Sequence, residues 1–179
     1  QFDANHAAKT SFETRRNRLI TDAFEPGSTL KTFAIAGALR EKIVSRVRQP
    51  IERYAGTHPD DAQMQLSYVL LLDVLADLAT ERRDTAEALR LRRQATGLGG
   101  DLVRRSPSDP RLLMRQATLL IKLGDVLRVT GDAKGRGRCY DDAFAFQQTA
   151  AALLPDDLEI SDDLIWSDLR RADVLKARY

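Results

Sequence analysis

The chain has 179 residues, of which 43% are hydrophobic and 6% aromatic, and its formal net charge at pH 7 is +2. This length is enough to bury a sizeable core as one domain. The small net charge excludes the strongly positive field of a typical nucleic-acid binder, so we expect no nucleic-acid partner. Scarce aromatic residues, short Val and Ile runs and few Gly and Pro residues predict an all-α protein.

The sequence also predicts a protein that neither crosses a membrane nor depends on disulfides. The longest apolar run, residues 68–72, stops at Asp73, far short of the roughly 20 residues that span a bilayer. Cys139 is the single cysteine, which excludes an internal disulfide and fits a reducing compartment. We therefore expect a cytoplasmic protein. Because the chain begins with Gln1, we interpret it as an excerpt or a processed product.

Residues 1–58 are predicted to form a degenerate first hairpin or an amino-terminal cap. Helical patterns cover residues 11–24 and 29–48, and the turn at 25–28 separates them, with Ser28 as the N-cap of the second helix. Pro50 is expected to kink or restart that helix.

A repeat follows. Pro59, Pro107 and Pro155 are evenly spaced, with a period of about 48 residues, and Asp residues follow each of them. Pro is tolerated in the first turn of a helix and Asp caps the free amides there, so each Pro with its following Asp residues predicts a helix start. The same shift superposes leucines and aspartates: Leu71 on Leu119, Leu72 on Leu120, Leu75 on Leu123, and Asp77 on Asp125 and Asp173.

We interpret this pattern as a single domain of stacked helix hairpins. The predicted units are a repeat at 59–106, a repeat at 107–154, and a capping or truncated helix at 155–179. The predicted helices run from about 62 to 80, 85 to 105, 111 to 129 and 133 to 153.

Glycines are expected to alter the predicted helices at three places. Gly131 suits a left-handed helix end before the N-cap Asp132. Gly124 is expected to let another backbone approach closely. The group Gly97, Gly99 and Gly100 lowers helix propensity by roughly 1 kcal/mol per residue, so we expect a kink or break near Leu98.

Leu123-Gly124-Asp125, followed by Tyr140, Ala143 and Pro155, resembles a tetratricopeptide (TPR) repeat. The repeat here is longer than the usual 34 residues of that family. The excess of about 14 residues equals about four helical turns, two for each helix, which keeps the helix faces in phase. The resemblance implies a right-handed α-solenoid that binds proteins or peptides. The pattern is similar to long-helix TPR-like arrays of bacterial multidomain signalling proteins.

Helix positions that are not used for packing are expected to line the concave face of such a stack and to bind the partner. These residues are Asp73, Asp77, Lys122, Asp125, Arg128, Trp166, Arg170 and Asp173. The recurring Asp77, Asp125 and Asp173 would form a ladder of carboxylates suited to a basic peptide. In the alternative interpretation, these aspartates bond to neighbouring helices and hold the stack together.

No catalytic, metal-binding or phosphate-binding pattern stands out. The two histidines, His6 and His58, are far apart and there is no second Cys, so we expect no metal. The glycines and basic residues at 97–100 and 131–138 match neither a dinucleotide fingerprint nor a P-loop. Basic clusters, including residues 90–93, are interpreted as solvated faces. We find no nucleophile with a motif that names its base, and expect neither enzymatic activity nor a cofactor.

The sequence thus predicts a non-enzymatic scaffold that binds a protein or peptide, cut from a larger bacterial signalling protein. Two alternatives stay open. One is a regulatory or sensor domain that holds a small ligand in a helical groove lined by Arg residues and Trp166. The other is homodimerisation through the unpaired helix at 160–178.

Overall fold

The computed structural model describes residues 42–44 and 46–176. The chain divides into two compact units, Gln1–Ile43 and Val44–Tyr179, and the fold below is that of the second unit. The predicted helix at 11–24 and turn at 25–28 lie outside the described residues. Residues 46–57 are helical and continue through Pro50.

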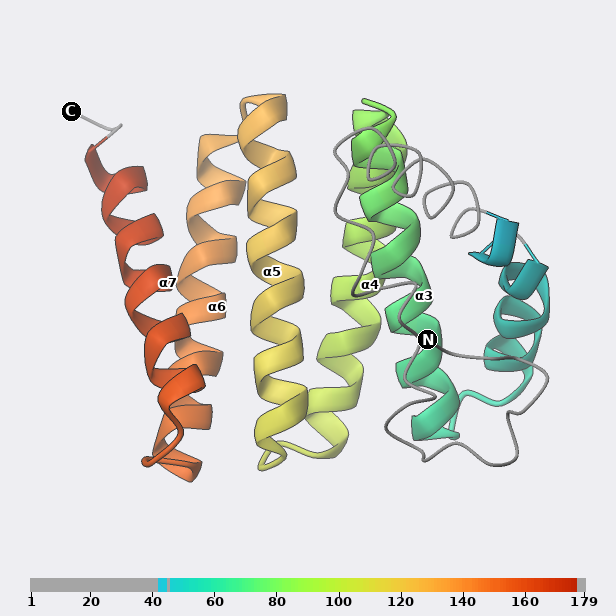
Figure 1. Cartoon of the computed structure of the whole chain (residues 1–179), viewed down its shortest axis with the longest axis horizontal. Coiled ribbons are helices and arrows are strands. Elements are labelled where there is room, and N and C mark those ends of the chain that lie inside the picture. Colours follow the sequence, from blue (N-terminus) through green and yellow to red (C-terminus); the bar gives the residue numbers. More distant parts are fainter. Residues whose placement is uncertain (1–41, 45, 177–179) are drawn as a thin grey trace, which may run out of the picture. The chain divides into compact units, whose positions relative to one another are not determined.

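The described part of the chain is all-helical and contains no strand, which confirms the predicted fold class of stacked antiparallel helix hairpins. Figure 1 shows consecutive helices running in opposite directions. The helices after residue 57 are α3 (Ala62–Glu81), α4 (Thr85–Arg105), α5 (Pro110–Thr130), α6 (Ala133–Leu153) and α7 (Leu158–Lys176).

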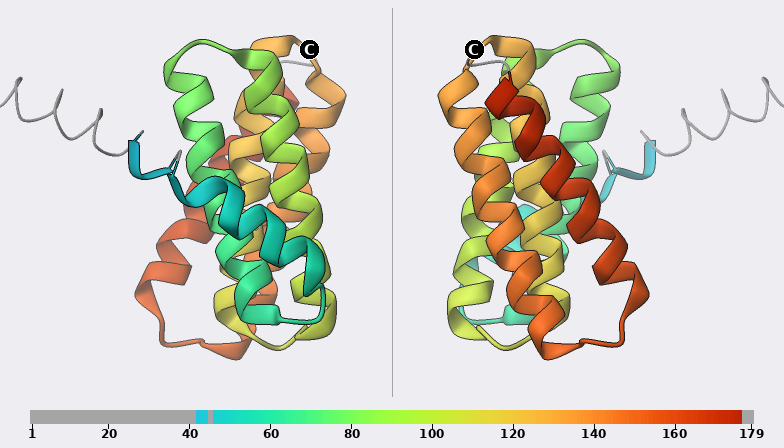
Figure 2. Two further views of the ribbon diagram at one scale, coloured as in Figure 1. Left: turned by 90° about the vertical axis from the view of Figure 1, so that its right-hand side faces the viewer. Right: turned by 90° about the vertical axis from the view of Figure 1, so that its left-hand side faces the viewer.

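Helix starts recur with the period that the prolines predict. Helices α3, α5 and α7 begin at residues 62, 110 and 158, and α4 and α6 begin at residues 85 and 133. Each helix packs against the next one in the chain, from α3 on α4 to α6 on α7; Figure 2 shows them from both ends of this row. The hairpins α3–α4 and α5–α6 are therefore structural repeats, and α7 stands where a third hairpin would begin.

Aspartate side chains cap all of these helices. The capping carboxylates, which accept hydrogen bonds from first-turn amides, belong to Asp61, Asp84, Asp109, Asp132 and Asp157. The predicted role of Asp as a helix start is thus confirmed. The three prolines that mark the period lie two residues before a cap, in the turn, and not in the first helical turn as expected.

The predicted break in the second helix of the first repeat is wrong, because α4 is continuous from Thr85 to Arg105. Gly99 supplies the physical reason. A Cβ at this position would lie 2.3 Å from Oε1 of Gln116 and 2.9 Å from Cδ1 of Leu119, both on α5. The glycine lets two helices approach closely, and this packing outweighs its low helix propensity.

The turns inside the two hairpins show a further equivalence. Gly131 has φ 81°, the left-handed conformation that the sequence predicts. Arg83, at the equivalent position of the preceding hairpin, has φ 60°, a conformation that non-glycine residues rarely adopt. The backbone thus keeps the same turn in both hairpins although the residue differs.

Buried apolar side chains fill the contacts between successive helices. One cluster joins α3, α4 and α5 and includes Leu72, Leu91 and Leu119. A second joins α5 and α6 and includes the buried thiol of Cys139. Further clusters extend the core to α7 at one end and to residues 44–51 at the other.

Among the described helices, α3 is long and apolar enough to cross a membrane by length and composition alone. A core helix of a stacked array meets the same criterion. Here 44% of the apolar window is buried inside the unit, and α3 carries the buried charge of Asp73. These features favour a core helix, and the expectation of no membrane partner stays a prediction.

Candidate functional site

A cavity of about 590 Å³ lies between α3, α4 and α5. Its lining comes from the C-terminal halves of α3 and α5, from the turn after α3 and from the first turns of α4. We call this cavity the α3–α5 groove. It is lined by apolar Ala88, Val126 and Val129, by Thr80 and Thr85, and by charged Asp77, Arg83, Arg92, Lys122, Asp125 and Arg128.

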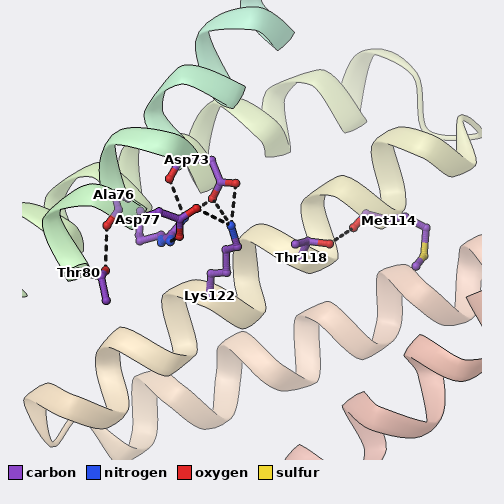
Figure 3. A network of polar contacts seen from close by, with 8 residues as sticks. Asp73, Ala76, Asp77, Thr80, Met114, Thr118 and Lys122 are labelled. Carbon is purple, nitrogen blue, oxygen red and sulfur yellow. Dashed lines mark hydrogen bonds and ion pairs between the residues drawn. The ribbon is translucent and has the colours of Figure 1, made fainter. Parts of the chain in front are cut away.

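A network of four charged side chains closes one side of this groove. Arg92 of α4 is 3% exposed, and its guanidinium pairs with the carboxylates of Asp73 and Asp77 on α3. The Nζ atom of Lys122 on α5 lies 2.9 Å from Oδ2 of Asp73 and 3.2 Å from Oδ2 of Asp77. Figure 3 shows both aspartates directed at Lys122. The network therefore links α3 to its own hairpin partner and to the next hairpin.

The network also shifts the ionisation of Asp77. Burial alone would raise the pKa of Asp77, but hydrogen bonds and positive charge from Arg92 and Lys122 outweigh burial and lower this pKa below its usual value of 3.8. Asp77 is thus a carboxylate at neutral pH whose charge is neutralised within the fold. Asp73 is likewise paired, and removing either of its partners would leave buried charge uncompensated.

Asp125 occupies the position in α5 that Asp77 occupies in α3. Its Oδ1 accepts a hydrogen bond of 2.7 Å from the hydroxyl of Tyr140 on α6. Burial and the hydrogen bond to Asp125 both raise the pKa of Tyr140. The Tyr140 ring lies against Gly124, where an added Cβ would come within 2.4 Å of Cε1. The predicted close approach at Gly124 is therefore made by an aromatic ring and not by a backbone.

The predicted partner-binding residues thus separate into two groups. The structure brings Asp73, Asp77 and Lys122 into one network, and Asp125 and Arg128 line the same groove. The members on α7 are exposed and line neither this groove nor a second cavity of about 430 Å³ between α5 and α7. They are Trp166, Arg170 and Asp173.

The contacts of Asp77 and Asp125 fit the alternative interpretation, in which these aspartates hold the stack together, because each aspartate bonds to the second helix of its own hairpin. A binding role for these residues stays a prediction. Asp173 has no hydrogen bond or ion pair with any other described residue.

Sequence reasoning missed the two donors of this site. Arg92 belongs to a basic cluster that the sequence suggests is solvated, but it is buried. Tyr140 is part of the TPR-like pattern, and its polar partner is not apparent from the sequence. The repeat itself contains the missing signal, since Arg92 and Tyr140 occupy equivalent positions and each lies 15 residues after an aspartate of the ladder.

The described residues hold no group of three or more His, Cys, Asp or Glu side chains that could bind a metal ion. Cys139 is buried, and burial raises the pKa of its thiol. A buried thiol with a raised pKa is a poor nucleophile. The groove can therefore offer hydrogen bonds, charge and apolar surface, which are means of recognition.

Comparison with known proteins concerns the other end of the chain. Residues 1–62 match the family model of the penicillin binding protein transpeptidase domain. Probable peptidoglycan D,D-transpeptidases PenA from Neisseria flavescens and Neisseria gonorrhoeae are each 50% identical to the chain over 38 residues, 21% of its length. That stretch is 10% of the first relative and 6% of the second. The chain therefore matches a tenth or less of the length of these curated relatives.

The matched segment contains a motif that sequence reasoning also missed. Ser28-Thr29-Leu30-Lys31 fits the S-x-x-K pattern in which penicillin-binding proteins carry their serine nucleophile. The helical pattern around Ser28 suggests only an N-cap. The two companion patterns, S-D-N and K-T-G, do not occur in the sequence. Residues 28–31 lie outside the described residues.

Proposed function

We propose that residues 62–176 form a non-enzymatic protein-interaction module of the TPR type, which binds a peptide or helical segment in the α3–α5 groove. The observation that carries this proposal is the groove itself, which is lined by apolar Ala88, Val126 and Val129 beside charged side chains. Such a surface holds an apolar anchor side chain while the charged side chains fix its orientation.

The charges of the groove favour an acidic partner over the basic one that the sequence suggested. Asp73 and Asp77 are neutralised by Arg92 and Lys122. The guanidinium groups of Arg83 and Arg128 have no ion-pair partner among the described residues, and both line the groove. Asp125 is the one lining carboxylate outside this network, so Arg83 and Arg128 leave the groove with a net positive charge, and we propose that the bound segment carries an acidic side chain beside its apolar anchor.

Peptides selected from a random library on the full chain would test this proposal. We expect selected peptides to be enriched in acidic and apolar residues, and to bind the variants Arg128→Glu and Val129→Asp about tenfold or more weakly. Arg111→Glu is the matched control, because Arg111 is exposed on the same helix but outside the groove.

Two results would contradict the proposal. Equal binding to Val129→Asp and to the parent chain would exclude the groove as the binding surface. Enrichment of basic peptides would exclude the proposed charge preference.

A small-ligand site is the second candidate, and one observation favours it. The groove volume of about 590 Å³ falls within the range of small-molecule sites. Trp166, which this alternative placed in the pocket, lies on α7 outside the groove. A thermal-shift screen of anionic metabolites would detect such a ligand as a rise in Tm that Arg128→Glu abolishes.

The transpeptidase-like segment needs its own test, because our proposal is of a protein without enzymatic activity. A fluorescent penicillin acylates a working S-x-x-K serine. We expect the full chain and its Ser28→Ala variant to be labelled equally, at background level. Labelling of the parent chain that Ser28→Ala removes would contradict a purely non-enzymatic role.

A further inference from the structure

Helix α7 presents an apolar face to solvent. Ile165, Leu169 and Leu175 are 61%, 52% and 55% exposed. In Figure 2, α7 is the last helix of the row, and no described helix covers its outer side. Exposed apolar side chains grouped on one helix face mark a candidate interaction surface.

The repeat identifies what this face does elsewhere in the molecule. Ile165 is equivalent to Val69 of α3 and Ala117 of α5 in the repeat, and both of these are 0% exposed. Leu175 corresponds in the same way to Ala79 and Leu127, which are also buried. In α3 and α5 these positions pack against the second helix of the hairpin, α4 and α6 respectively. Ile165 and Leu175 of α7 therefore stand at positions that receive a second helix in α3 and α5, whereas exposed Asp168 stands where α3 and α5 have the buried Leu72 and Leu120.

A polar position on this face repeats the same pattern. Asp77 and Asp125 each accept a hydrogen bond from a donor 15 residues later, on the second helix of their hairpin. Asp173 is the third member of that series, and it is exposed. Among residues 46–176, no side chain donates to its carboxylate as Arg92 and Tyr140 do to the two equivalents.

The residue before each aspartate specifies which donor fits. Gly124 precedes Asp125, and a Cβ there would collide with the Tyr140 ring at 2.4 Å. Ala76 precedes Asp77, and there the donor is the guanidinium of Arg92. Ala172 precedes Asp173, so α7 resembles the arginine-type hairpin and excludes a tyrosine placed as in α6.

We propose that the outer face of α7 is a docking surface for an amphipathic helix of a partner, which packs its apolar side on Ile165, Leu169 and Leu175 and presents an arginine to Asp173. On both existing second helices an alanine lies three residues after the donor, Ala95 after Arg92 and Ala143 after Tyr140. The partner helix therefore carries arginine and, three residues later, a small residue that allows close approach to α7.

A second copy of α7 does not fit this description. Three residues after its two adjacent arginines, Arg170 and Arg171, α7 has Asp173 and Val174 in place of a small residue. The required pattern is present in α4, whose own sequence therefore serves as a probe.

The probe is a synthetic peptide with the sequence of residues 84–106 and the change Gly97→Ala, which favours the helix. It is titrated against the full chain, and binding is followed by anisotropy of a label on the peptide and by fluorescence of Trp166, the single tryptophan of the chain. We expect saturable binding. We also expect a loss of about tenfold or more when the protein carries Asp173→Asn or the peptide carries Arg92→Leu, since a charge-assisted hydrogen bond is lost.

Two protein variants separate docking on α7 from other events. Ile165→Glu places a charge in the apolar face at an exposed position, so it should abolish binding while leaving Tm unchanged. Asp163→Asn removes an exposed charge from the opposite side of α7 and should bind the peptide as the parent does.

Three results would overturn the inference. The first is undiminished binding to Ile165→Glu, which would mean that the peptide replaces α4 inside the fold. The second is no binding at peptide concentrations up to about 1 mM. The third is a dimer of the chain alone that Ile165→Glu dissociates, which would assign the face to a second copy.

Discussion

The hairpins α3–α4 and α5–α6 have the same backbone arrangement but differ in chemistry where their two helices meet. In the first hairpin Asp77 pairs with Arg92, and in the second Asp125 accepts a hydrogen bond from Tyr140. The first hairpin also has a second carboxylate, Asp73, and in the second hairpin Ile121 takes that place. One contact between helices is thus made once by buried charge and once by an aromatic ring.

This difference shows that the residues around the contact differ together between the two hairpins. The Tyr140 ring requires glycine at residue 124, because any larger side chain would collide with it. The Arg92 guanidinium is compatible with alanine at residue 76, and its burial depends on its pairing with the carboxylates of Asp73 and Asp77. The buried charges also connect neighbouring hairpins, which the tyrosine contact does not do.

The largest expected loss of stability comes from breaking the ion pairs of the first hairpin. Asp73→Ala removes the buried partner of Arg92, so we expect a loss of about 3 kcal/mol in the free energy of unfolding. Ile121→Ala at the equivalent position should cost about 1–2 kcal/mol, because Ile121 is half-buried and apolar. Urea unfolding followed by circular dichroism measures both. Equal losses would mean that the ion-pair network contributes no more than ordinary packing.

A smaller loss of stability is expected when a side chain is added beside the Tyr140 ring of the second hairpin. Gly124→Ala forces the Tyr140 ring to move, which should cost about 2 kcal/mol. The control is Gly97→Ala, because no atom lies within 4 Å of a Cβ at residue 97. There the better helix propensity of alanine should stabilise the protein by about 0.5–1 kcal/mol. Destabilisation by both changes would show that the loss at Gly124 is not caused by the ring.

Removing one hydroxyl tests the hydrogen bond of the second hairpin. Tyr140→Phe should cost about 1 kcal/mol at neutral pH. The pKa of Tyr140 is raised above its usual value of 10 in the folded state, so the unfolded chain ionises first and stability falls as pH rises above about 10. The Phe variant should lose less stability than the parent over that alkaline range. An identical alkaline decline in both proteins would contradict the buried hydrogen bond.

The smallest expected effect is on the stability of the protein at acidic pH. The pKa of Asp77 is lowered on folding, so its contribution is fully present above the usual carboxyl value and is lost as pH falls through the lowered pKa. Asp77→Asn should therefore destabilise the protein at neutral pH and flatten the decline in stability between about pH 5 and pH 3. Parallel acid curves for variant and parent would contradict the pairing of Asp77 with Arg92 and Lys122.

Much of the fold follows from local sequence signals. The helix boundaries of both hairpins lie within about one residue of the predictions, because Asp caps and the turn at Gly131 are local features. The unbroken α4 could not be predicted this way. Helix propensity alone makes Gly99 unfavourable in a helix. Its role in close helix packing depends on the contact with Gln116 of α5, which the sequence does not show.

The candidate site could be predicted only in part, for a related reason. The aspartates stand out by their period, but their partners Arg92 and Tyr140 differ in type, so no search for one repeated residue finds them. Whether a lysine or arginine is solvated depends on tertiary contacts, and Arg92 is buried only because Asp73 and Asp77 face it. The sequence places Trp166 near the concave face, but in the structure this side chain is 66% exposed on α7 and does not line the groove.

The central claim is that residues 76, 77 and 92 and residues 124, 125 and 140 are equivalent sets. A double-mutant cycle of Gly124→Ala and Tyr140→Arg in the second hairpin tests it most directly, with unfolding free energies measured in urea. If the sets are equivalent, arginine relieves the clash and pairs with Asp125, so the double variant should be more stable than the sum of the single losses by about 1 kcal/mol or more. Strictly additive losses would contradict the equivalence of the two hairpins.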